Sequence, residues 1–330
     1  MKRLLYIMTY YLGINRLFYF LNRKKQRVLT YHNVISDVLF DNALHLGVSC
    51  SQSTFHWQIE YLKKRFRFVT EPGIEGSCVI TFDDGYQNNF RVARPTLDKF
   101  GVMAYFFVPL DSVGNAEPLW VDKALMWVSY VPQGDYTLWD EDFSISGEPS
   151  RRALWQAIWE RALLSPDFQK SLANALEQVF PFADLPVCSA MMQERFEHMD
   201  HEQISGLKSA GHLVGAHSLN HLILATLDKS ALADDFSKCA KGIGSVYNTE
   251  VYSYPFGGEE EVSPPVIEQC EGSEFSMAFM NSEQGHRQRP SSPFAMARMS
   301  LPSSTDRFLI DARLSGVEAF LRGMLKRISA

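Results

Sequence analysis

The chain has 330 residues, of which 46% are hydrophobic and 21% are charged, enough for one large α/β domain or two smaller ones. Its formal net charge of -6, with scattered Lys and Arg, argues against nucleic acid as the main partner, because phosphate binding depends on clustered cations. The five cysteines are far apart and form neither a C-x-x-C motif nor a disulfide-like framework. We interpret them as reduced thiols and expect a cytoplasmic protein.

Residues 1–26 form a basic and apolar N-terminal segment. An apolar run of 11 residues, Leu4 to Ile14, lacks a small-residue cleavage site and is too short to cross a bilayer, which takes about 20 residues. A second apolar run over residues 17–21 precedes a basic cluster at 23–25. We predict an amphipathic helix that either lies on an anionic membrane surface, peripheral to the inner face, or packs on the protein's own body.

The rest of the chain alternates between short apolar runs and amphipathic segments. Strands are predicted over residues 27–34, 66–70, 78–82, 103–108, 212–216, 250–254, 275–280 and 295–301. Helices are predicted over residues 55–65, 90–100, 201–210, 227–247 and 306–328. Residues 110–200 are helical, rich in Trp and without a clear strand pair, so we interpret them as an insertion in a catalytic domain spanning 27–330. This alternation implies an α/β fold with a mostly parallel sheet, open or closed into a barrel.

Polar residues that can carry chemistry stand at the ends of these strands. They are His32, Asp83, Asp84, His217 and the turn at Pro255, all at or just past C-terminal strand ends, where α/β folds bind ligands. Asp83-Asp84-Gly85 alone also fits an ordinary acidic turn. His217 and His221, four residues apart, would share one side of a helical turn. The other histidines nearby lack a partner at ligand spacing and are expected at the surface or in caps: His198, His201 and His212.

One carboxylate and two imidazoles are enough to hold a divalent metal while leaving positions open for water and substrate. Two adjacent aspartates raise each other's cost of ionisation, and a bound cation removes that objection. We therefore expect a metal site in which the second carboxylate is free to act as a base.

The motifs together resemble those of the polysaccharide deacetylase family, also called carbohydrate esterase family four. Residues 81–85 (Thr-Phe-Asp-Asp-Gly) are similar to its first motif, and residues 217–221 (His-Ser-Leu-Asn-His) are similar to its second. Residues 254–257 (Tyr-Pro-Phe-Gly) resemble the third motif. Residues 30–34 (Thr-Tyr-His-Asn-Val) resemble the branch that acts on exopolysaccharide and related bacterial amino sugars. The resemblance spans about residues 27–328 and implies a distorted (β/α) barrel of about seven strands with a helical insertion.

The resemblance also implies a role for each motif residue. Asp84, His217 and His221 would bind the metal, expected to be zinc, although nickel, cobalt and iron suit the same ligands. Asp83 would be the general base that takes a proton from the attacking water. His32 would be the general acid that protonates the leaving amine, because an amine leaves poorly unless it is protonated.

The sequence departs from the family pattern in two places. Many relatives carry an arginine in the third motif that orients the base aspartate, and Ser253 stands at that position here. Arg298, after a late apolar strand, is expected either to supply this guanidinium or to be a structural surface residue. The late motif that provides the acid in other branches is not evident, since His286 lies in a polar stretch typical of a loop. His32 therefore takes the acid role, against the alternative of a core histidine bonded to the backbone.

Three further residues are assigned to the substrate. Tyr86 follows the aspartates, while Pro255 and Phe256 form the third-motif turn, where a backbone N–H near Phe256 would add an oxyanion donor. Trp120 and Asp122 are close enough in sequence to line the pocket, but we leave them out of the catalytic set because Trp in helices more often serves packing.

The leading hypothesis is a metal-dependent hydrolase that removes N-acetyl groups from amino sugars of a glycan or its lipid-linked precursor. A second hypothesis keeps the enzyme but changes the substrate to a non-sugar amide such as a cyclic imide or ureide, which a small closed pocket would favour. A third is a catalytically silent glycan-binding protein, which would need neither base nor acid.

Overall fold

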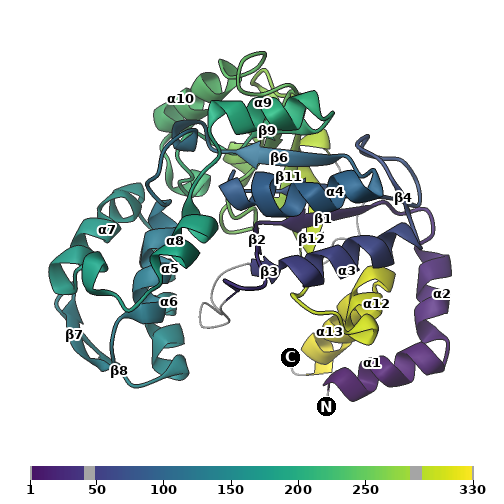
Figure 1. The fold of residues 1–330 in the computed structure, drawn as a ribbon, viewed down its shortest axis with the longest axis horizontal. Coiled ribbons are helices and arrows are strands. Elements are labelled where there is room, and N and C mark those ends of the chain that lie inside the picture. Colours follow the sequence, from purple (N-terminus) through teal and green to yellow (C-terminus); the bar gives the residue numbers. More distant parts are fainter. Residues whose placement is uncertain (1, 41–48, 283–291, 329–330) are drawn as a thin grey trace.

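The barrel at the centre of the computed structural model, which describes residues 2–40, 49–282 and 292–328, closes from seven parallel strands (Figure 1). These are β1 (Arg27–Tyr31), β5 (Ser77–Phe82), β6 (Ala104–Val108), β9 (Leu213–Ala216), β10 (Val251–Ser253), β11 (Met277–Asn281) and β12 (Met296–Ser300). The order around the barrel is β1-β12-β11-β10-β9-β6-β5, and β5 pairs back with β1. The predicted distorted (β/α) barrel of about seven strands is confirmed.

Alternation along the strands gives the barrel an apolar interior with a polar end. On β5, Ile80 and Phe82 pack into the large core between the strands and the surrounding helices. Val79 faces inward and joins a smaller core with Phe107 and Phe279. The next inward positions toward the C-terminal end of β5 are polar, so the chemistry lies at one mouth of the barrel.

Helices surround the barrel as expected, with several differences in their bounds. The principal ones are α3 (Gln52–Lys63), α4 (Arg94–Phe100), α9 (His201–Ser209), α10 (Lys229–Ala240), α11 (Pro264–Glu271), α12 (Arg307–Ser315) and α13 (Val317–Ile328). Short turns are the π-helical η1 (Asn89–Ala93) and the 3-10 helices η2 (Leu110–Ser112), η3 (Phe182–Asp184), η4 (Leu224–Thr226) and η5 (Pro293–Ala295). The predicted helix over 306–328 is wrong as a single element, because Gly316, with φ 94°, ends α12.

The remaining strands also differ from expectation. The first predicted strand is interrupted at His32, which separates β1 from β2 (Asn33–Ile35), and β2 pairs in parallel with β3 (Ser49–Ser51). The predicted strand over 66–70 shortens to β4 (Arg67–Phe68) beside the start of β5. The interruption leaves the His32 side chain at the barrel mouth instead of inside a continuous strand.

The insertion forms a lobe beside the barrel with a hydrophobic core of its own, seen on the left of Figure 1. It contains α5 (Trp120–Tyr130), α6 (Glu148–Ala162), α7 (Pro166–Val179) and α8 (Ser189–Phe196). The expectation of no strand pair is wrong, because β7 (Gly134–Leu138) and β8 (Glu141–Ile145) form an antiparallel hairpin. Its turn residues Trp139 and Asp140 both have positive φ, a conformation that usually shows in sequence as Asn-Gly or Asp-Gly.

The N-terminal segment is two helices, not the single helix predicted over 1–26. They are α1 (Lys2–Tyr11) and α2 (Ile14–Leu21), and the chain turns between them at Gly13, with φ 76°. Both helices contact α12. No helix of the described residues is both long and apolar enough to span a membrane.

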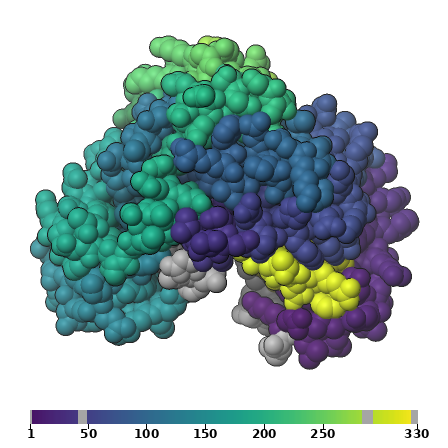
Figure 2. All heavy atoms as spheres, in the orientation of Figure 1, coloured from purple at the N-terminus to yellow at the C-terminus, as the bar shows by residue number. Residues whose placement is uncertain are grey.

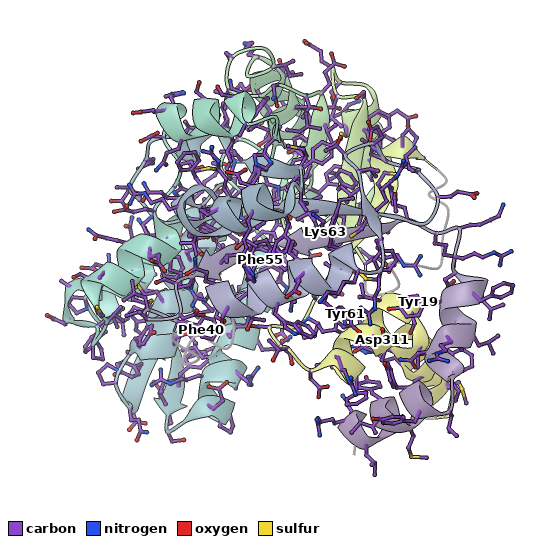
Figure 3. The ribbon with its side chains drawn as sticks, turned by 45° about the vertical axis from the view of Figure 1, so that its right-hand side comes forward. Tyr19, Phe40, Phe55, Tyr61, Lys63 and Asp311 are labelled. Atoms are coloured by element: carbon purple, nitrogen blue, oxygen red, sulfur yellow. The ribbon has the colours of Figure 1, made fainter. Side chains whose placement is uncertain are left out.

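A buried carboxylate anchors this N-terminal pair to the body. Asp311 on α12 is 4% exposed and accepts hydrogen bonds from Asn15, Tyr19 and Tyr61 at 3.0 to 3.1 Å (Figure 3). Arg65 lies 3.7 Å from the same carboxylate and supplies positive charge. These contacts join α2, α3 and α12 around one group, and α1 packs against α12 through Tyr6 and Ala312, so the N-terminal helices are a fixed part of the structure.

We expect Asp311→Ala to lower the free energy of unfolding by about 1–3 kcal/mol, because it leaves buried donors without an acceptor. Urea denaturation followed by circular dichroism measures this loss. Arg3→Ala is the control, since it removes only an exposed ion pair with Asp306 and is expected to change stability little. Equal stability of Asp311→Ala and the wild type would contradict the anchoring role.

Candidate active site

The two aspartates lie side by side in the sharp turn that ends β5. Asp83 is 1% exposed and Asp84 is 6% exposed. Asp84 adopts a left-handed conformation with φ 71°, and Gly85 follows with φ 69°. A Cβ on Gly85 would lie 2.8 Å from Val108 Cγ1, so only glycine fits there. The turn sends the two carboxylates to different partners.

Asp84 meets the two histidines that follow β9. Its Oδ1 lies 3.3 Å from His217 Nε2 and 3.0 Å from His221 Nε2. All three residues are buried, and their ligand atoms lie within 4.8 Å of one another. Tetrahedral bonds of about 2.0–2.2 Å to zinc place neighbouring ligand atoms roughly 3.3–3.6 Å apart, so the cluster has the dimensions of a metal site.

The hydrogen bonding of His217 fits this use. Its Nδ1 lies 2.7 Å from the Ser253 carbonyl oxygen, which can only accept, so Nδ1 carries the proton. Nε2 then presents a lone pair toward the ionised Asp84, and two acceptors cannot bond each other. Among the described residues, Nε2 has no hydrogen-bond partner. A shared cation satisfies both groups, and the carbonyl behind His217 is the usual support for a histidine ligand.

Asp83 instead forms a bidentate ion pair with Arg298 from β12. Arg298 donates from its two terminal nitrogens to the two carboxylate oxygens, at 2.7 and 2.6 Å. The Ser253 hydroxyl donates to the same carboxylate at 3.2 Å and accepts from Arg298 at 2.9 Å. Arg298 is 0% exposed, so it is not a surface residue. The guanidinium therefore reaches Asp83 from another strand, while Ser253 stands at the third motif.

Because of these contacts, the pKa values of the two carboxylates are set by different neighbours. Burial alone would raise the pKa of Asp83, but the charges of Arg298 and His217 outweigh it and hold the pKa below its usual range. Burial opposes ionisation of Asp84 too, but the neighbouring imidazoles of His32, His217 and His221 keep its pKa well below the usual range. Both groups are therefore ionised near neutral pH.

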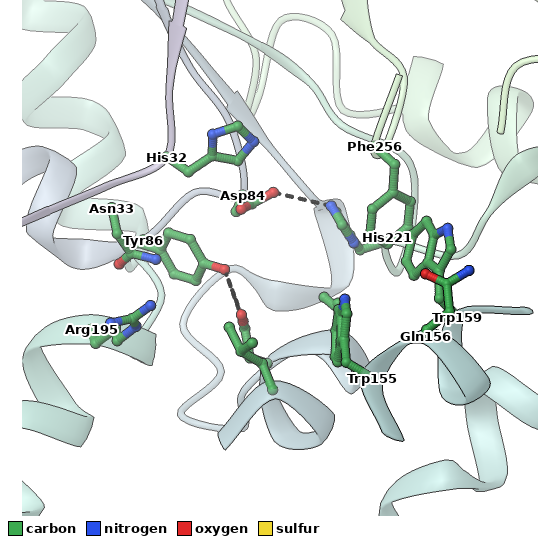
Figure 4. Close-up of a pocket in the computed structure, with 13 residues that line it drawn as sticks. His32, Asn33, Asp84, Tyr86, Trp155, Gln156, Trp159, Arg195, His221 and Phe256 are labelled. Carbon is green, nitrogen blue, oxygen red and sulfur yellow. Dashed lines mark hydrogen bonds and ion pairs between the residues drawn. The ribbon is translucent and has the colours of Figure 1, made fainter. Parts of the chain in front are cut away.

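His32 lies on the wall of the same pocket. Its Nε2 is 3.8 Å from Asp83 Oδ2, and its side chain is 13% exposed. Asn89 donates to the His32 carbonyl oxygen at 2.6 Å, which fixes the backbone at the break between β1 and β2. Figure 4 shows Asp84 between His32 and His221. The imidazole of His32, which has access to the pocket, therefore faces the cluster of Asp84, His217 and His221.

The pocket has a volume of about 260 Å³ and is walled by the insertion. The barrel contributes His32, Asn33, Asp84, Tyr86, His221 and Phe256. The insertion contributes Val121, Asp122, Leu125, Trp155, Gln156, Trp159 and Arg195. The Phe256 ring lies against both His221 and Trp159, at 4.7 and 4.9 Å between ring centroids. An aromatic wall thus stands next to the Asp-His-His cluster.

The third-motif turn is held in a strained conformation. Phe256 has φ 60°, and Asn281 donates to its carbonyl oxygen at 2.7 Å. Phe256 lines the pocket, whereas Pro255 is buried and is not part of the lining in the described chain. Of six non-glycine residues with positive φ in the described part, four lie at this site: Asp84, Ser218, His221 and Phe256. Such strain gathers where backbone geometry serves a site.

Tyr86 is buried instead of facing open solvent. Its hydroxyl donates to Asp122, at 2.9 Å from both carboxylate oxygens. Burial and the charge of Asp84 raise the pKa of Asp122 to about 8. Trp120 is not part of the pocket lining in the described chain; it donates to the His221 carbonyl oxygen at 2.9 Å and supports the Asp-His-His cluster from behind.

Two expectations about other histidines are wrong. His198 is 4% exposed and stacks on Tyr86, with ring centroids 5.6 Å apart, and burial lowers its pKa to about 4. His212 is 0% exposed, and its Nδ1 accepts from the Ala104 N–H. His201 is exposed, as predicted, at the start of α9. His286 lies outside the described residues.

Comparisons with known proteins agree with the motifs. A family model described as "Polysaccharide deacetylase" matches residues 167–271. The fold is similar to that of a Streptococcus pyogenes deacetylase, PplD, solved with acetate, at 12% identity and a TM-score of 0.53, covering 84% of this chain and 92% of that one. Among curated proteins, no sequence match was found.

Two further solved structures share the fold. IcaB from Ammonifex degensii has 17% identity and a TM-score of 0.52, covering 88% of this chain and 97% of that one. A de-N-acetylase from Aggregatibacter actinomycetemcomitans has 14% identity and a TM-score of 0.50, covering 87% and 99%. The family match and the fold confirm the resemblance predicted from the motifs.

We expect the purified protein to bind one divalent metal ion, and His217→Ala to lose it, because the remaining two ligands hold a metal weakly. Metal analysis after dialysis and calorimetric titration with zinc measure this. His201→Ala is the matched control, since it changes an exposed histidine outside the cluster. Unchanged zinc affinity in His217→Ala would rule out this site.

The affinity for zinc is expected to fall as pH falls. Burial alone would lower the pKa of His217, but Asp83 and Asp84 outweigh it and raise that pKa above 6.5. Protons therefore compete with the metal for His217 already above pH 6.5. Titrations with zinc at pH 6, 7 and 8 test this, and an affinity independent of pH would contradict it.

Proposed function

We propose that this chain is a metal-dependent hydrolase that removes N-acetyl groups from amino sugars, which its match to the polysaccharide deacetylase family model over residues 167–271 and its barrel fold support. The substrate would be a glycan or its lipid-linked precursor. The observation that carries the proposal is the joint placement of a buried Asp-His-His cluster and a separately ion-paired aspartate at one barrel mouth.

Asp84, His217 and His221 would hold a divalent metal, expected to be zinc with nickel, cobalt or iron as alternatives. When bound, the metal would supply Lewis acidity, lowering the pKa of a nearby water and polarising the acetyl carbonyl. The Ser253 carbonyl oxygen accepts from His217, and the Trp120 indole N–H donates to the His221 carbonyl oxygen, which keeps the two histidines aligned.

The other residues would move and hold protons. Asp83, ionised by its pairing with Arg298, would accept the proton of the attacking water. Arg298 would act as a positioning residue, since its two donors fix both carboxylate oxygens of Asp83. His32, on the pocket wall near Asp83, would donate a proton to the leaving amine. The metal ligands, the general base and the general acid would thus be different residues.

The insertion supports a sugar as the substrate. Trp155, Trp159 and Phe256 offer aromatic surfaces beside the cluster, which suit the apolar faces of a sugar ring or an acetyl methyl group. Asp122, Gln156 and Arg195 add polar groups that can bind hydroxyls. The Phe256 backbone N–H and Tyr86 remain our candidates for oxyanion and substrate contacts.

A pocket of about 260 Å³ also accommodates a small cyclic imide or ureide. The second hypothesis, hydrolysis of a non-sugar amide, therefore stays an alternative. The third hypothesis, a silent glycan-binding protein, has less support. A binding module has no need of an aspartate base held ionised by a buried arginine beside a metal-type cluster.

Acetate release from a panel of N-acetylated oligosaccharides tests the proposal, with a cyclic imide and a ureide in the same panel. Asp83→Asn is expected to retain metal and to lose roughly 10²–10⁴-fold in kcat, because it removes the base. Asp167→Asn, on the exposed surface, is the control. The proposal fails if acetate release is the same with chelator and in Asp83→Asn, or if only the cyclic amides are hydrolysed.

Arg298→Lys is expected to lower kcat by about 10–100-fold with little change in KM or metal content, because lysine cannot make the bidentate pair. The acidic limb of the pH profile is expected to move to higher pH, since a lysine ammonium keeps the charge but loses the paired hydrogen bonds that help to depress the pKa of Asp83. Thermal unfolding checks that the variant folds. An unchanged pH profile would show that Arg298 serves only structure.

A further inference from the structure

Exposed apolar side chains gather on one part of the molecule. In the described part of the chain, fourteen large apolar side chains are exposed, and ten of them lie within residues 4–21 and on α13. The other four are scattered singly, as is ordinary for a soluble surface. We call the exposed apolar residues of 4–21, together with Phe320 and Met324, the apolar face. A concentration of this kind marks a surface that meets a partner.

The apolar face follows the outer side of the N-terminal helices. On α1, Leu4, Met8 and Tyr11 are 63%, 51% and 70% exposed and stand one helical turn apart. Tyr6 on the other side of α1 is buried in a small core with Ala312. Figure 2 shows both N-terminal helices, in purple, at the outer edge of the molecule. Each helix therefore has one apolar side docked and another side uncovered.

The face continues across α2 onto α13 and is held rigidly. Leu17 and Phe20 on α2 are 55% and 60% exposed, and Phe320 on α13 is 40% exposed. The rings of Phe18 and Phe320 are 5.2 Å apart, which joins the two helices. The Asp311 hydrogen bonds fix α2 against the body, so the uncovered side chains belong to a docked structure and not to a frayed terminus.

The segment that carries most of the apolar face is basic in a protein that is negative overall, although two of its cations pair with acidic groups of the body, Arg3 with Asp306 and Lys24 with Glu75. The first 26 residues contain Lys2, Arg3, Arg16 and the cluster 23–25, and they contain no Asp or Glu. The whole chain has a formal net charge of -6. Cations next to exposed apolar side chains match a surface that is anionic outside and apolar within.

We propose that the apolar face docks on an anionic lipid bilayer, with α1 and α2 lying in the headgroup region. α1 has ten residues and is about 15 Å long, so it lies on a membrane and does not cross it. The apolar side chains would enter the acyl boundary while Lys and Arg contact lipid phosphates. This inference is independent of the proposed deacetylation, since none of its residues lines the active-site pocket.

Sedimentation of the full-length protein with vesicles tests the proposal. Vesicles of phosphatidylcholine alone are compared with vesicles that also contain phosphatidylglycerol. We expect binding to the anionic vesicles, weakened by salt, and about tenfold or more weaker binding for the double variant Leu17→Glu with Phe20→Glu. Val38→Glu with Leu164→Glu is the matched control, because it places the same charges at isolated exposed apolar sites.

Light scattering without lipid measures self-association in the same samples. The proposal is overturned if the wild type binds neither kind of vesicle, or if the Leu17 and Phe20 double variant binds vesicles as well as the control does. It is also overturned if no form binds vesicles and the double variant is a monomer where the wild type is a dimer. Acetate release from a soluble substrate is expected to be equal in all forms. Its absence in every form would contradict the proposed function and leave the vesicle result standing.

Discussion

The structure depends on keeping two adjacent carboxylates ionised inside a protein. Asp83 and Asp84 are both buried at the end of β5, and an isolated buried charge is strongly unfavourable. Groups of opposite charge or polarity on other strands of the barrel offset the cost of burying these two charges. Arg298 arrives from β12 and neutralises Asp83, while the histidines after β9 face Asp84. Removing one partner of such a buried pair costs roughly 3–5 kcal/mol, so the charges bind the strands together as well as serving chemistry.

The same arrangement gives two chemically similar residues different roles. A carboxylate fixed by a guanidinium on both oxygens keeps its orientation and charge, which suits a group that exchanges protons with water. Its neighbour faces two imidazoles and an unsatisfied lone pair, which suits a metal ligand. The insertion then adds aromatic and polar walls that the barrel lacks, and the pocket arises where the two lobes meet.

Much of the site could be predicted because its residues belong to short motifs at the ends of apolar strands. The alternation of strands and helices indicated a mostly parallel sheet, and the family resemblance indicated that it closes into a barrel. Arg298 was harder, since its contact with Asp83 depends on closure of the barrel, which no local pattern encodes. The hairpin of the insertion was missed because Trp139 and Asp140 occupy a turn usually formed by glycine. Trp155 and Arg195 gave no signal, because their place at the pocket depends on how the insertion packs.

The first and last strands of the barrel pair with each other, β1 with β12. During synthesis the N-terminal part of a domain emerges first, yet here it cannot complete its sheet until residues 296–300 have left the ribosome. Asp84, His217 and His221 are all made by residue 221, whereas Arg298, which fixes the orientation of Asp83, comes much later. The Asp-His-His group is therefore synthesised well before the guanidinium, and the orientation of Asp83 is set only when the last strand closes the barrel.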